Sequence, residues 1–292
     1  MSIEIQTGSS GRYAPAGSQA WDQNTVAQDV CQLTEHLEAV AESSPIQFAW
    51  QHAIELMHLE PGDRSLDAGC GAGSFLPSMA ERLGATGEIV GLDHAPEFLD
   101  QARIRFAADG WEPSLTLVAA DINAMPFAEG SFDSAHCERV LIHVADPQFA
   151  LTELKRVVRP GGWVVAVEPD LAGWRIDHED AEAARFIAAG FASTIRNPAM
   201  GLELNRRMAL VGLIDRQLRF VTEIETTVED EAFVYFERAA STAVERGWLP
   251  EPRAKDALRA LKAQTTAGQF TSYSSLFICA GRVPLGSDLS DQ

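Results

Sequence analysis

The chain of 292 residues is long enough to bury a full hydrophobic core, and 46% hydrophobic with 22% charged residues is typical of a folded globular protein. Its 42 acidic residues against 23 basic ones give a formal net charge of −19, which repels phosphate backbones and excludes DNA and RNA as expected partners. No apolar run reaches the ~18 residues that a membrane span requires, and the N-terminus lacks the pattern of a secretion signal, so the sequence predicts a cytoplasmic protein without a membrane span.

The N-terminal region precedes the first predicted strand. Residues 1–19 are rich in Gly, Ser, Ala and Pro without periodicity, and we expect them to form a flexible tail, as we do residues 284–292. Within residues 20–60, apolar residues at spacings of three and four predict two helices separated by Ser-Ser-Pro at 43–45. We expect these helices to form part of a lid.

Short apolar strands alternate with helices in the next part of the chain. Strands are predicted at 64–69, 88–93, 115–121, 132–137 and 161–169. Helices are predicted at 74–84, 96–108 and 147–158. This alternation predicts an α/β fold with a doubly wound parallel sheet, in which ligands bind at the carboxyl ends of the strands.

The pattern changes after residue 169. Helices are predicted at 178–193, 201–213, 229–245 and 251–264, and strands at 216–225 and 272–283. We expect residues 61–225 to form the α/β core, with 267–283 as its last strand. Residues 226–266 then form a helical insertion that covers the sheet edge as a lid.

A glycine-rich segment, Leu-Asp-Ala-Gly-Cys-Gly-Ala-Gly, follows the first predicted strand. Gly69, Gly71 and Gly73 lie between a strand and a helix, where backbone N–H groups approach a nucleotide. The dinucleotide fingerprint requires Gly or Ala where Ser74 stands, and Asp67 would repel a pyrophosphate, so a nicotinamide oxidoreductase is disfavoured. A nucleotide with a cationic end, such as S-adenosylmethionine, suits the carboxylate better.

Two further strand ends carry acidic residues. Asp93 lies 20 residues after Gly73, at the spacing where a carboxylate accepts hydrogen bonds from both ribose hydroxyls. Asp121 ends the third strand and Ile122 follows it, which provides a carboxylate for an adenine amino group and an apolar side chain for its face. Acids at three successive strand ends favour a bound nucleotide over a merely tight turn.

Taken in order, these segments resemble the consecutive motifs of class I S-adenosylmethionine-dependent methyltransferases. The matching stretches are LDAGCGAG, GLDHA, AADINAMPFAEGSFD and LIHVADPQFALTELKRVVRPGGWVVAVEPD. The sequence is most similar to the branch of ubiquinone and menaquinone biosynthesis enzymes, over roughly residues 45–170. The resemblance implies a seven-stranded Rossmann-like sheet in the order 3-2-1-4-5-7-6 with an antiparallel last strand.

The resemblance also implies a set of cofactor-binding residues at the strand ends. They are Asp67, Gly69, Gly71, Gly73, Asp93, His94, Asp121, Ile122, Cys137 and Glu138. The glycine loop with its aspartate matches the methionine end of the cofactor, the pair after the second strand matches the ribose, and the pair after the third strand matches the adenine. Cys137 and Glu138 match the position that lines the methyl-transfer site.

The acceptor side of the predicted site carries weaker signals. If the acceptor is a hydroxyl or an enolisable carbon, it loses a proton, and His143 is the best-placed base by residue type. The alternative is that His143 ties its loop to the backbone or orders the cofactor. We expect an apolar pocket that includes Trp50, Glu168, Trp174 and Tyr235, although Glu168 could instead cap the following helix, and most aromatics at helical spacing belong to the core.

The sequence therefore predicts an enzyme that moves the methyl group of S-adenosylmethionine to an O, C or N atom of a largely apolar small molecule, leaving S-adenosylhomocysteine. Quinone-like compounds and secondary metabolites are the candidate acceptors. The alternative is an S-adenosylmethionine-binding protein of the same fold with a regulatory or cyclisation role. The widely spaced cysteines and histidines form no metal-ligand pattern, so we predict no metal, and a homo-oligomer is left open.

Overall fold

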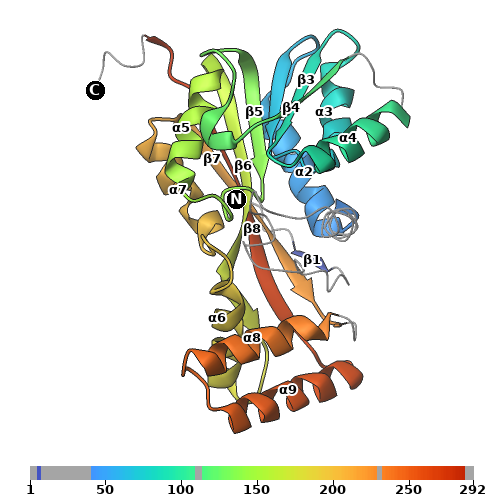
Figure 1. The fold of residues 1–292 in the computed structure, drawn as a ribbon, viewed down its shortest axis with the longest axis vertical. Coiled ribbons are helices and arrows are strands. Elements are labelled where there is room, and N and C mark those ends of the chain that lie inside the picture. The colour runs from blue at the N-terminus through green and yellow to red at the C-terminus, as the bar shows by residue number, and fades with distance from the viewer. Residues whose placement is uncertain (1–4, 8–40, 109–113, 229–231, 287–292) are drawn as a thin grey trace.

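The structure, a computed structural model, describes residues 5–7, 41–108, 114–228 and 232–286. Its centre is an eight-stranded sheet in the order β1-β7-β8-β6-β5-β2-β3-β4. Strand β8 is antiparallel to both of its neighbours, and the other strand pairs are parallel. Helices cover both faces of the upper sheet, and long strands extend from it toward a second group of helices (Figure 1).

The parallel strands and their crossover helices build the upper part of the molecule in Figure 1. The strands are β2 (Arg64–Ala68), β3 (Glu88–Asp93), β4 (Leu115–Ala119), β5 (Phe132–Glu138) and β6 (Val158–Ile176). The helices beside them are α2 (Ser44–Met57), α3 (Leu76–Leu83), α4 (Pro96–Ala108), the short η2 (Ile122–Ala124), α5 (Pro147–Val157) and α7 (Met200–Leu210). A proline in the first turn begins α2, α3 and α5, where its missing N–H costs no helical hydrogen bond.

Three long strands continue beyond the parallel sheet. β6 is 19 residues long and ends at Ile176, where it still pairs with the first residue of β8 (Ser272–Arg282). β7 (Ile214–Glu225) pairs with the other edge of β8, and the short β1 (Ile5–Thr7) lies parallel to β7. The predicted strand 161–169 was too short, because the antiparallel partner β8 supplies backbone hydrogen bonds past the end of the parallel sheet.

The sheet order confirms the predicted topology. If the strands from β2 to β8 are numbered 1 to 7, the order is 3-2-1-4-5-7-6 with an antiparallel last strand. β1 adds an eighth strand at the edge, within the segment 1–19 that the sequence predicted to be a tail. The rest of that segment lies outside the described residues, as do residues 20–40 of the predicted N-terminal helices.

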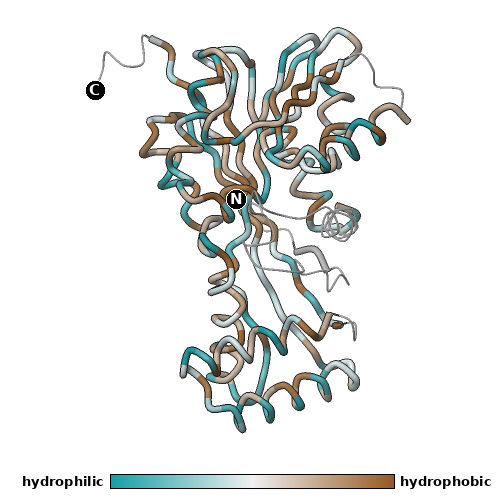
Figure 2. The backbone as a smooth tube through the Cα atoms, viewed as in Figure 1, coloured by the Kyte–Doolittle hydropathy of each residue, from teal (hydrophilic) through white to brown (hydrophobic). Residues whose placement is uncertain are grey.

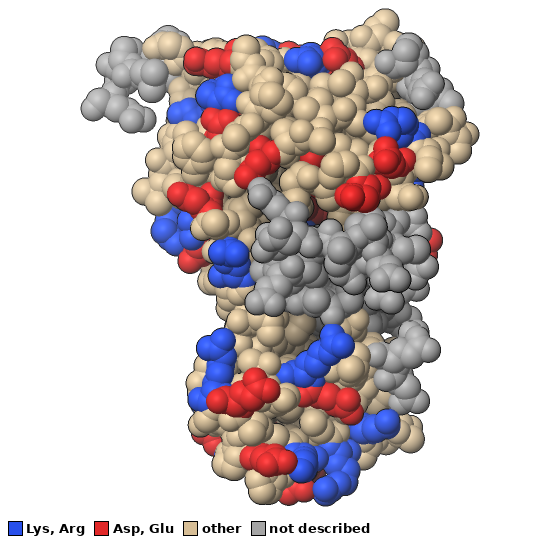
Figure 3. All heavy atoms as spheres, viewed as in Figure 1, with Lys and Arg blue, Asp and Glu red and all other residues tan. Residues whose placement is uncertain are grey.

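The surface carries both signs of charge. Figure 3 shows acidic and basic side chains interspersed over the described part of this face, without an extended basic area. Such a surface lacks the electrostatic footprint of a nucleic-acid-binding protein on this side. Among the described residues, no helix combines the length and the apolar character that crossing a bilayer requires.

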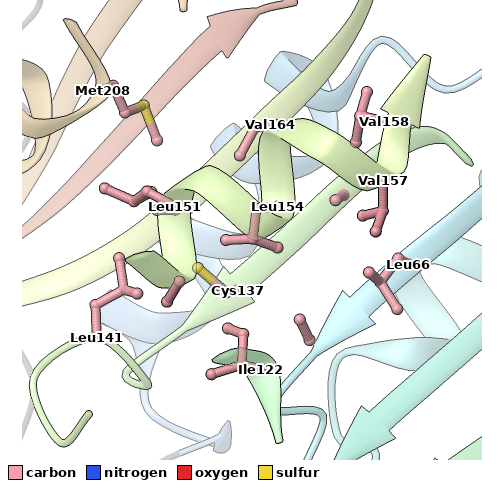
Figure 4. Packing of buried hydrophobic residues seen from close by; sticks show 14 of the residues in the cluster. Leu66, Ile122, Cys137, Leu141, Leu151, Leu154, Val157, Val158, Val164 and Met208 are labelled. Carbon is pink, nitrogen blue, oxygen red and sulfur yellow. The ribbon is translucent and has the colours of Figure 1, made fainter. Parts of the chain in front are cut away.

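Buried side chains fill both faces of the upper sheet. Along β6, Val164 and Ala166 belong to the cluster that α5 and α7 cover, and Val165 and Val167 belong to the cluster that α2 and α3 cover. Figure 4 shows part of the first cluster, and Figure 2 shows hydrophobic stretches through the upper strands. Successive strand residues thus face two cores, as expected for a parallel strand covered on both sides.

The second group of helices has an apolar core of its own. It consists of α6 (Ala181–Ala192), α8 (Phe233–Glu245) and α9 (Glu251–Thr266), at the far end of the long strands (Figure 1). Trp174, near the end of β6, is buried among these helices, and its ring centroid lies 5.4 Å from that of Phe236. We call this group the distal helical lobe.

Our first prediction concerns the contact between α6 and α8. A Cβ at Gly190 would collide with the backbone oxygen of Ala239, so the two helices approach each other without a side chain between them. In an exposed helix Gly→Ala stabilises by roughly 1 kcal/mol. Here we expect Gly190→Ala to lower the free energy of unfolding by about 1–3 kcal/mol, measured by urea denaturation, because it forces the helices apart.

The control for this prediction is Ala263→Gly on the exposed side of α9. It should cost only the difference in helix propensity, roughly 1 kcal/mol. A Gly190→Ala variant that is more stable than the wild type would contradict the close approach of α6 and α8.

Candidate functional site

A cavity of about 490 Å³ is lined by residues at the carboxyl ends of β2, β3, β4 and β5 and by residues of β7 and β8. Its volume lies within the roughly 300–1,000 Å³ that is typical of ligand pockets. Further lining residues come from the start of α2 and from the end of α6 and the segment after it. The cavity therefore joins the strand ends, where a ligand was predicted, to the long strands.

The loop after β2 turns through glycines with positive φ. The φ angles of Gly69, Gly71 and Gly73 are 82°, 51° and 79°, a region that residues with a Cβ rarely adopt. A Cβ at Gly69 would collide with Val140, and one at Gly73 would lie 2.9 Å from the Cβ of Ala102. Gly69 and Gly71 line the cavity, whereas Gly73 does not and is instead required for packing against α4.

Asp93 joins the glycine loop to the end of β3. Its carboxylate accepts hydrogen bonds from the N–H groups of Gly71 and Ala95, both at 2.9 Å. Burial raises the pKa of Asp93, against the opposing effects of these N–H donors and of His94, whose Nδ1 lies 3.4 Å from the carboxylate. Asp93 and His94 both line the cavity, so the residues predicted at the ribose lie together beside Gly71.

Asp121 and Ile122 line the same end of the cavity. Asp121 Oδ1 accepts hydrogen bonds from the backbone N–H of Asn123 at 2.8 Å and from its side-chain amide at 3.1 Å, and it thereby caps η2. Asn123 also lines the cavity, and its buried side-chain oxygen has no hydrogen-bond partner among the described residues. No sequence signal had singled out Asn123, because only the turn of η2 brings its side chain to the wall.

Asp67 at the end of β2 pairs with a histidine on the neighbouring strand. Asp67 Oδ1 lies 2.8 Å from His136 Nδ1, both side chains are almost completely buried, and both residues line the cavity. The ring of Phe75 covers that of His136, with the centroids 4.1 Å apart. The sequence analysis did not assign His136 to the site, because its position beside Asp67 depends on the pairing of β2 with β5.

Cys137 and Glu138, predicted as a pair, point to opposite faces of β5. Cys137 is fully buried in the cluster under α5 and does not line the cavity, and this burial raises the pKa of its thiol well above the ordinary value. Glu138 lines the cavity and accepts hydrogen bonds from Trp50 Nε1 and from Arg139 Nε. The alternation of strand side chains therefore leaves only Glu138, with Trp50 of α2, at the site.

His143 lines the cavity in the loop after β5. Burial lowers the pKa of its imidazole to about 3, and the charges of Arg139 and Arg196 lower it further. An efficient general base has a pKa near the operating pH. The surroundings of His143 thus make it a neutral and weakly basic group, which does not favour the predicted role as a base.

Glu168 does not line the cavity, which corrects its predicted place in the substrate pocket. Its fully buried carboxylate accepts hydrogen bonds from the N–H groups of Val140, Leu141 and Ile142 at 3.0, 2.7 and 3.3 Å. Burial nevertheless raises the pKa of Glu168 to about 8. Glu168 therefore holds the loop that carries His143.

Trp174 and Tyr235 also lie away from the cavity. Trp174 is buried in the distal helical lobe, and Tyr235 packs against that cluster. Neither residue lines the cavity, because the spacing of these aromatics serves contacts between helices. The segment 226–266, expected to be a lid, packs α8 and α9 against α6, and none of its described residues lines the cavity.

The long strands contribute a part of the cavity wall that the sequence analysis did not identify. Glu223 and Glu225 come from β7, and Ser274 and Ser275 come from β8. The pairing of β7 with β8 brings these polar side chains together, so no single stretch of sequence predicts that they share a cavity wall. Arg139, with φ of 53°, lies at the end of β5 and lines the same cavity.

This arrangement defines an α/β protein with a ligand cavity at the carboxyl ends of its parallel strands. Residues 66–166 match the family model described as a methyltransferase domain. The chain thus carries a methyltransferase domain of the class I S-adenosylmethionine-dependent type, which confirms the predicted family resemblance.

Relatives with curated descriptions cover part of the chain. An uncharacterized 37.1 kDa protein in transposon TN4556 of Streptomyces fradiae is 34% identical over 200 residues, which are 68% of this chain and 57% of that protein. A demethylmenaquinone methyltransferase of Staphylococcus epidermidis is 29% identical over 145 residues, which are 50% of this chain and 59% of that protein. The chain therefore spans less than two thirds of the length of these curated relatives.

Solved structures share the fold. The YcgJ protein from Bacillus subtilis superposes with a TM-score of 0.57 at 18% sequence identity, over 82% of this chain and 100% of that chain. This likeness supports the Rossmann-like methyltransferase fold. Among the described residues, no group of three or more His, Cys, Asp or Glu side chains is placed to hold a metal ion.

Our second prediction follows from the burial of Glu168. Its pKa of about 8 in the folded chain lies above the ordinary value of 4.5, so the folded state holds the proton more tightly than the unfolded state. This contribution to stability is complete below about pH 4.5 and is lost as the pH rises toward 8. We therefore compare the free energies of unfolding of the wild type and of Glu168→Gln. Across this window the value of the wild type should fall relative to that of the variant, by up to about 1.4 kcal/mol per pH unit.

Urea denaturation of both proteins at pH 5, 6, 7 and 8 measures this difference. The exposed Glu237 on α8 provides the control. The free energy of unfolding of Glu237→Gln should change with pH in parallel with that of the wild type. A constant difference between the wild type and Glu168→Gln over the whole range would show that Glu168 is already ionised at pH 5.

Proposed function

We propose that the protein is a methyltransferase that uses S-adenosylmethionine to methylate an O, C or N atom of a largely apolar small molecule. The observation that carries this proposal is that one cavity is lined both by the glycine loop with the strand-end carboxylates and by apolar side chains from outside the parallel sheet. The first set suits the cofactor, and the second suits an acceptor beside it.

The residues of the first set fit S-adenosylmethionine better than a phosphate-bearing nucleotide. Asp67, Asp93 and Asp121 place three carboxylates along one end of the cavity, which suits ammonium, sulfonium and hydroxyl groups and opposes phosphates. The N–H of Gly71 already donates to Asp93, so it is not available to hold a phosphate. Gly71 itself allows the cofactor to approach the backbone.

The chain then holds the cofactor through named groups. Asp67, with His136, would face the methionine end, Asp93 and His94 would accept hydrogen bonds from the ribose, and Asp121 with Ile122 would face the adenine. When bound, the cofactor supplies an electrophilic methyl group on a sulfonium. The protein contributes by aligning donor and acceptor and by excluding water from the reacting atoms.

Apolar residues of α2, β6 and α6 and of the segment after α6 would receive the acceptor. They are Ile46, Trp50, Leu171, Phe191 and Ile195. The likeness to a demethylmenaquinone methyltransferase supports an acceptor with a quinone-like ring. A small-molecule partner and a cytoplasmic location, as the sequence predicts, agree with this proposal.

The test is transfer of a tritiated methyl group from S-adenosylmethionine to reduced 1,4-naphthoquinone (1,4-dihydroxynaphthalene), with 1-naphthol and 1-naphthylamine as further acceptor probes. We expect a labelled product that requires both the protein and a probe. Binding of S-adenosylmethionine in calorimetry without transfer to any probe would favour the alternative, a binding or cyclisation protein of the same fold.

Our third prediction concerns Asp93. Asp93→Asn keeps the size of the side chain but removes the charge that strengthens hydrogen bonds from the ribose hydroxyls, so we expect S-adenosylmethionine to bind about 1–3 kcal/mol more weakly. Isothermal titration calorimetry measures this loss. Asp100→Asn on the exposed face of α4 is the control and should bind the cofactor as the wild type does. Equal affinities of the two variants would remove Asp93 from the cofactor site.

A further inference from the structure

Two carboxylates on β7 form a feature of the cavity that the methyltransferase motifs do not explain. Glu223 and Glu225 are two residues apart on one strand, so their side chains point to the same face, and both line the cavity. Glu225 is buried and accepts a hydrogen bond from Ser272 Oγ at 2.9 Å. The carboxyl of Glu223 makes no hydrogen bond within the described part of the chain.

The neighbours of Glu223 differ in charge from element to element. On β8 the uncharged Ser274 lies directly across from it, and on β1 the backbone of Gln6 pairs with it. Glu225 on its own strand repels its negative charge, and Arg139 at the end of β5 attracts it. Burial, with the smaller effect of Glu225, raises the pKa of Glu223 to about 7 in spite of Arg139.

Arg139 connects this carboxylate to the predicted methyl-transfer end of the cavity. Its backbone N–H donates to the carbonyl oxygen of Val167 at 2.9 Å, and its guanidinium Nε donates to Glu138 Oε1 at 3.0 Å. The same side chain contributes to the electrostatic environment of Glu223 and of His143. Glu223 therefore lies within electrostatic reach of Arg139, whose guanidinium contacts Glu138, the residue that the family resemblance places at the reacting methyl group.

We propose that Glu223 is the general base of the methyl transfer and accepts the proton of the acceptor's nucleophilic atom; this inference rests on the proposed function. The acceptor atom forms its bond to the methyl carbon while the carbon–sulfur bond of the sulfonium breaks and its electron pair stays on sulfur. The proton of the acceptor passes to the Glu223 carboxylate, and later to solvent. The products are the methylated acceptor, S-adenosylhomocysteine and a proton.

This role defines the class of acceptor further. The nucleophilic atom must carry a dissociable proton, as a phenolic hydroxyl or a hydroquinone does. The two carboxylates of β7 oppose an anionic group at this end of the cavity, so phosphate- or carboxylate-bearing acceptors are disfavoured. His143 and Glu223 are the two candidate bases in the cavity. The pKa of Glu223, about 7, suits a base at neutral pH, whereas the pKa of His143, about 3, does not.

The experiment compares Glu223→Gln, Glu223→Asp and the exposed Glu237→Gln as a charge-matched control, with reduced 1,4-naphthoquinone as the acceptor probe. We expect Glu223→Gln to lower kcat roughly 100- to 10,000-fold without changing the Kd of S-adenosylmethionine. Because the base must be ionised, kcat of the wild type should rise with pH through about 7, and Glu223→Gln should lose this rise. Glu223→Asp should restore part of kcat and the pH dependence, and Glu237→Gln should match the wild type.

A wild-type protein that methylates the probe while Glu223→Gln keeps its kcat and pH profile would overturn the inference and leave the proposed function intact. A wild-type protein that methylates none of the probes would count against the proposed function and, because the inference rests on it, against the inference as well. The two failures are thus distinguishable by whether the wild type transfers the methyl group.

Discussion

The antiparallel pairing of β6 with β8 is the constraint on which the site depends. The ladder runs from Trp163 opposite Arg282 to Ile176 opposite Ser272, so it starts inside the parallel sheet and continues past the carboxyl ends of the other strands. β7 pairs along the same β8 and extends with it. The result is a second wall beside the strand ends, and the distal helical lobe packs at the far end of that wall (Figure 1).

The cavity contains several carboxylates whose neighbours give them different tasks. Asp67 pairs with His136, Asp93 accepts two backbone N–H groups, and Glu138 accepts hydrogen bonds from Trp50 and Arg139. These acids are held in place by their partners and are suited to binding. Glu223 differs from these acids, because its carboxyl is desolvated and makes no hydrogen bond among the described residues. Glu223 is therefore suited to accepting a proton.

The family match and the acceptor side of the cavity occupy different parts of the chain. The methyltransferase domain match ends at residue 166 and includes the glycine loop and the acids at the ends of β2, β3 and β4. The apolar and polar residues proposed to face the acceptor come mainly from α2 before it and from α6, β7 and β8 after it. Under the proposed function, the choice of acceptor would rest on the segments that surround the shared domain.

The sequence by itself determined that Gly71, Asp93 and Asp121 lie at one edge of the sheet, because all three stand at or just after the ends of strands and parallel strands end at the same edge. It also determined the strand order through the family resemblance. Only the tertiary structure decided which neighbouring residues share a face: it directs Cys137 into the core and Glu138 into the cavity. Pairing across distant strands brought His136 to Asp67 and Glu223 to the cavity wall, and helix packing buried Trp174 away from it, since contacts between distant segments leave no local pattern in the chain.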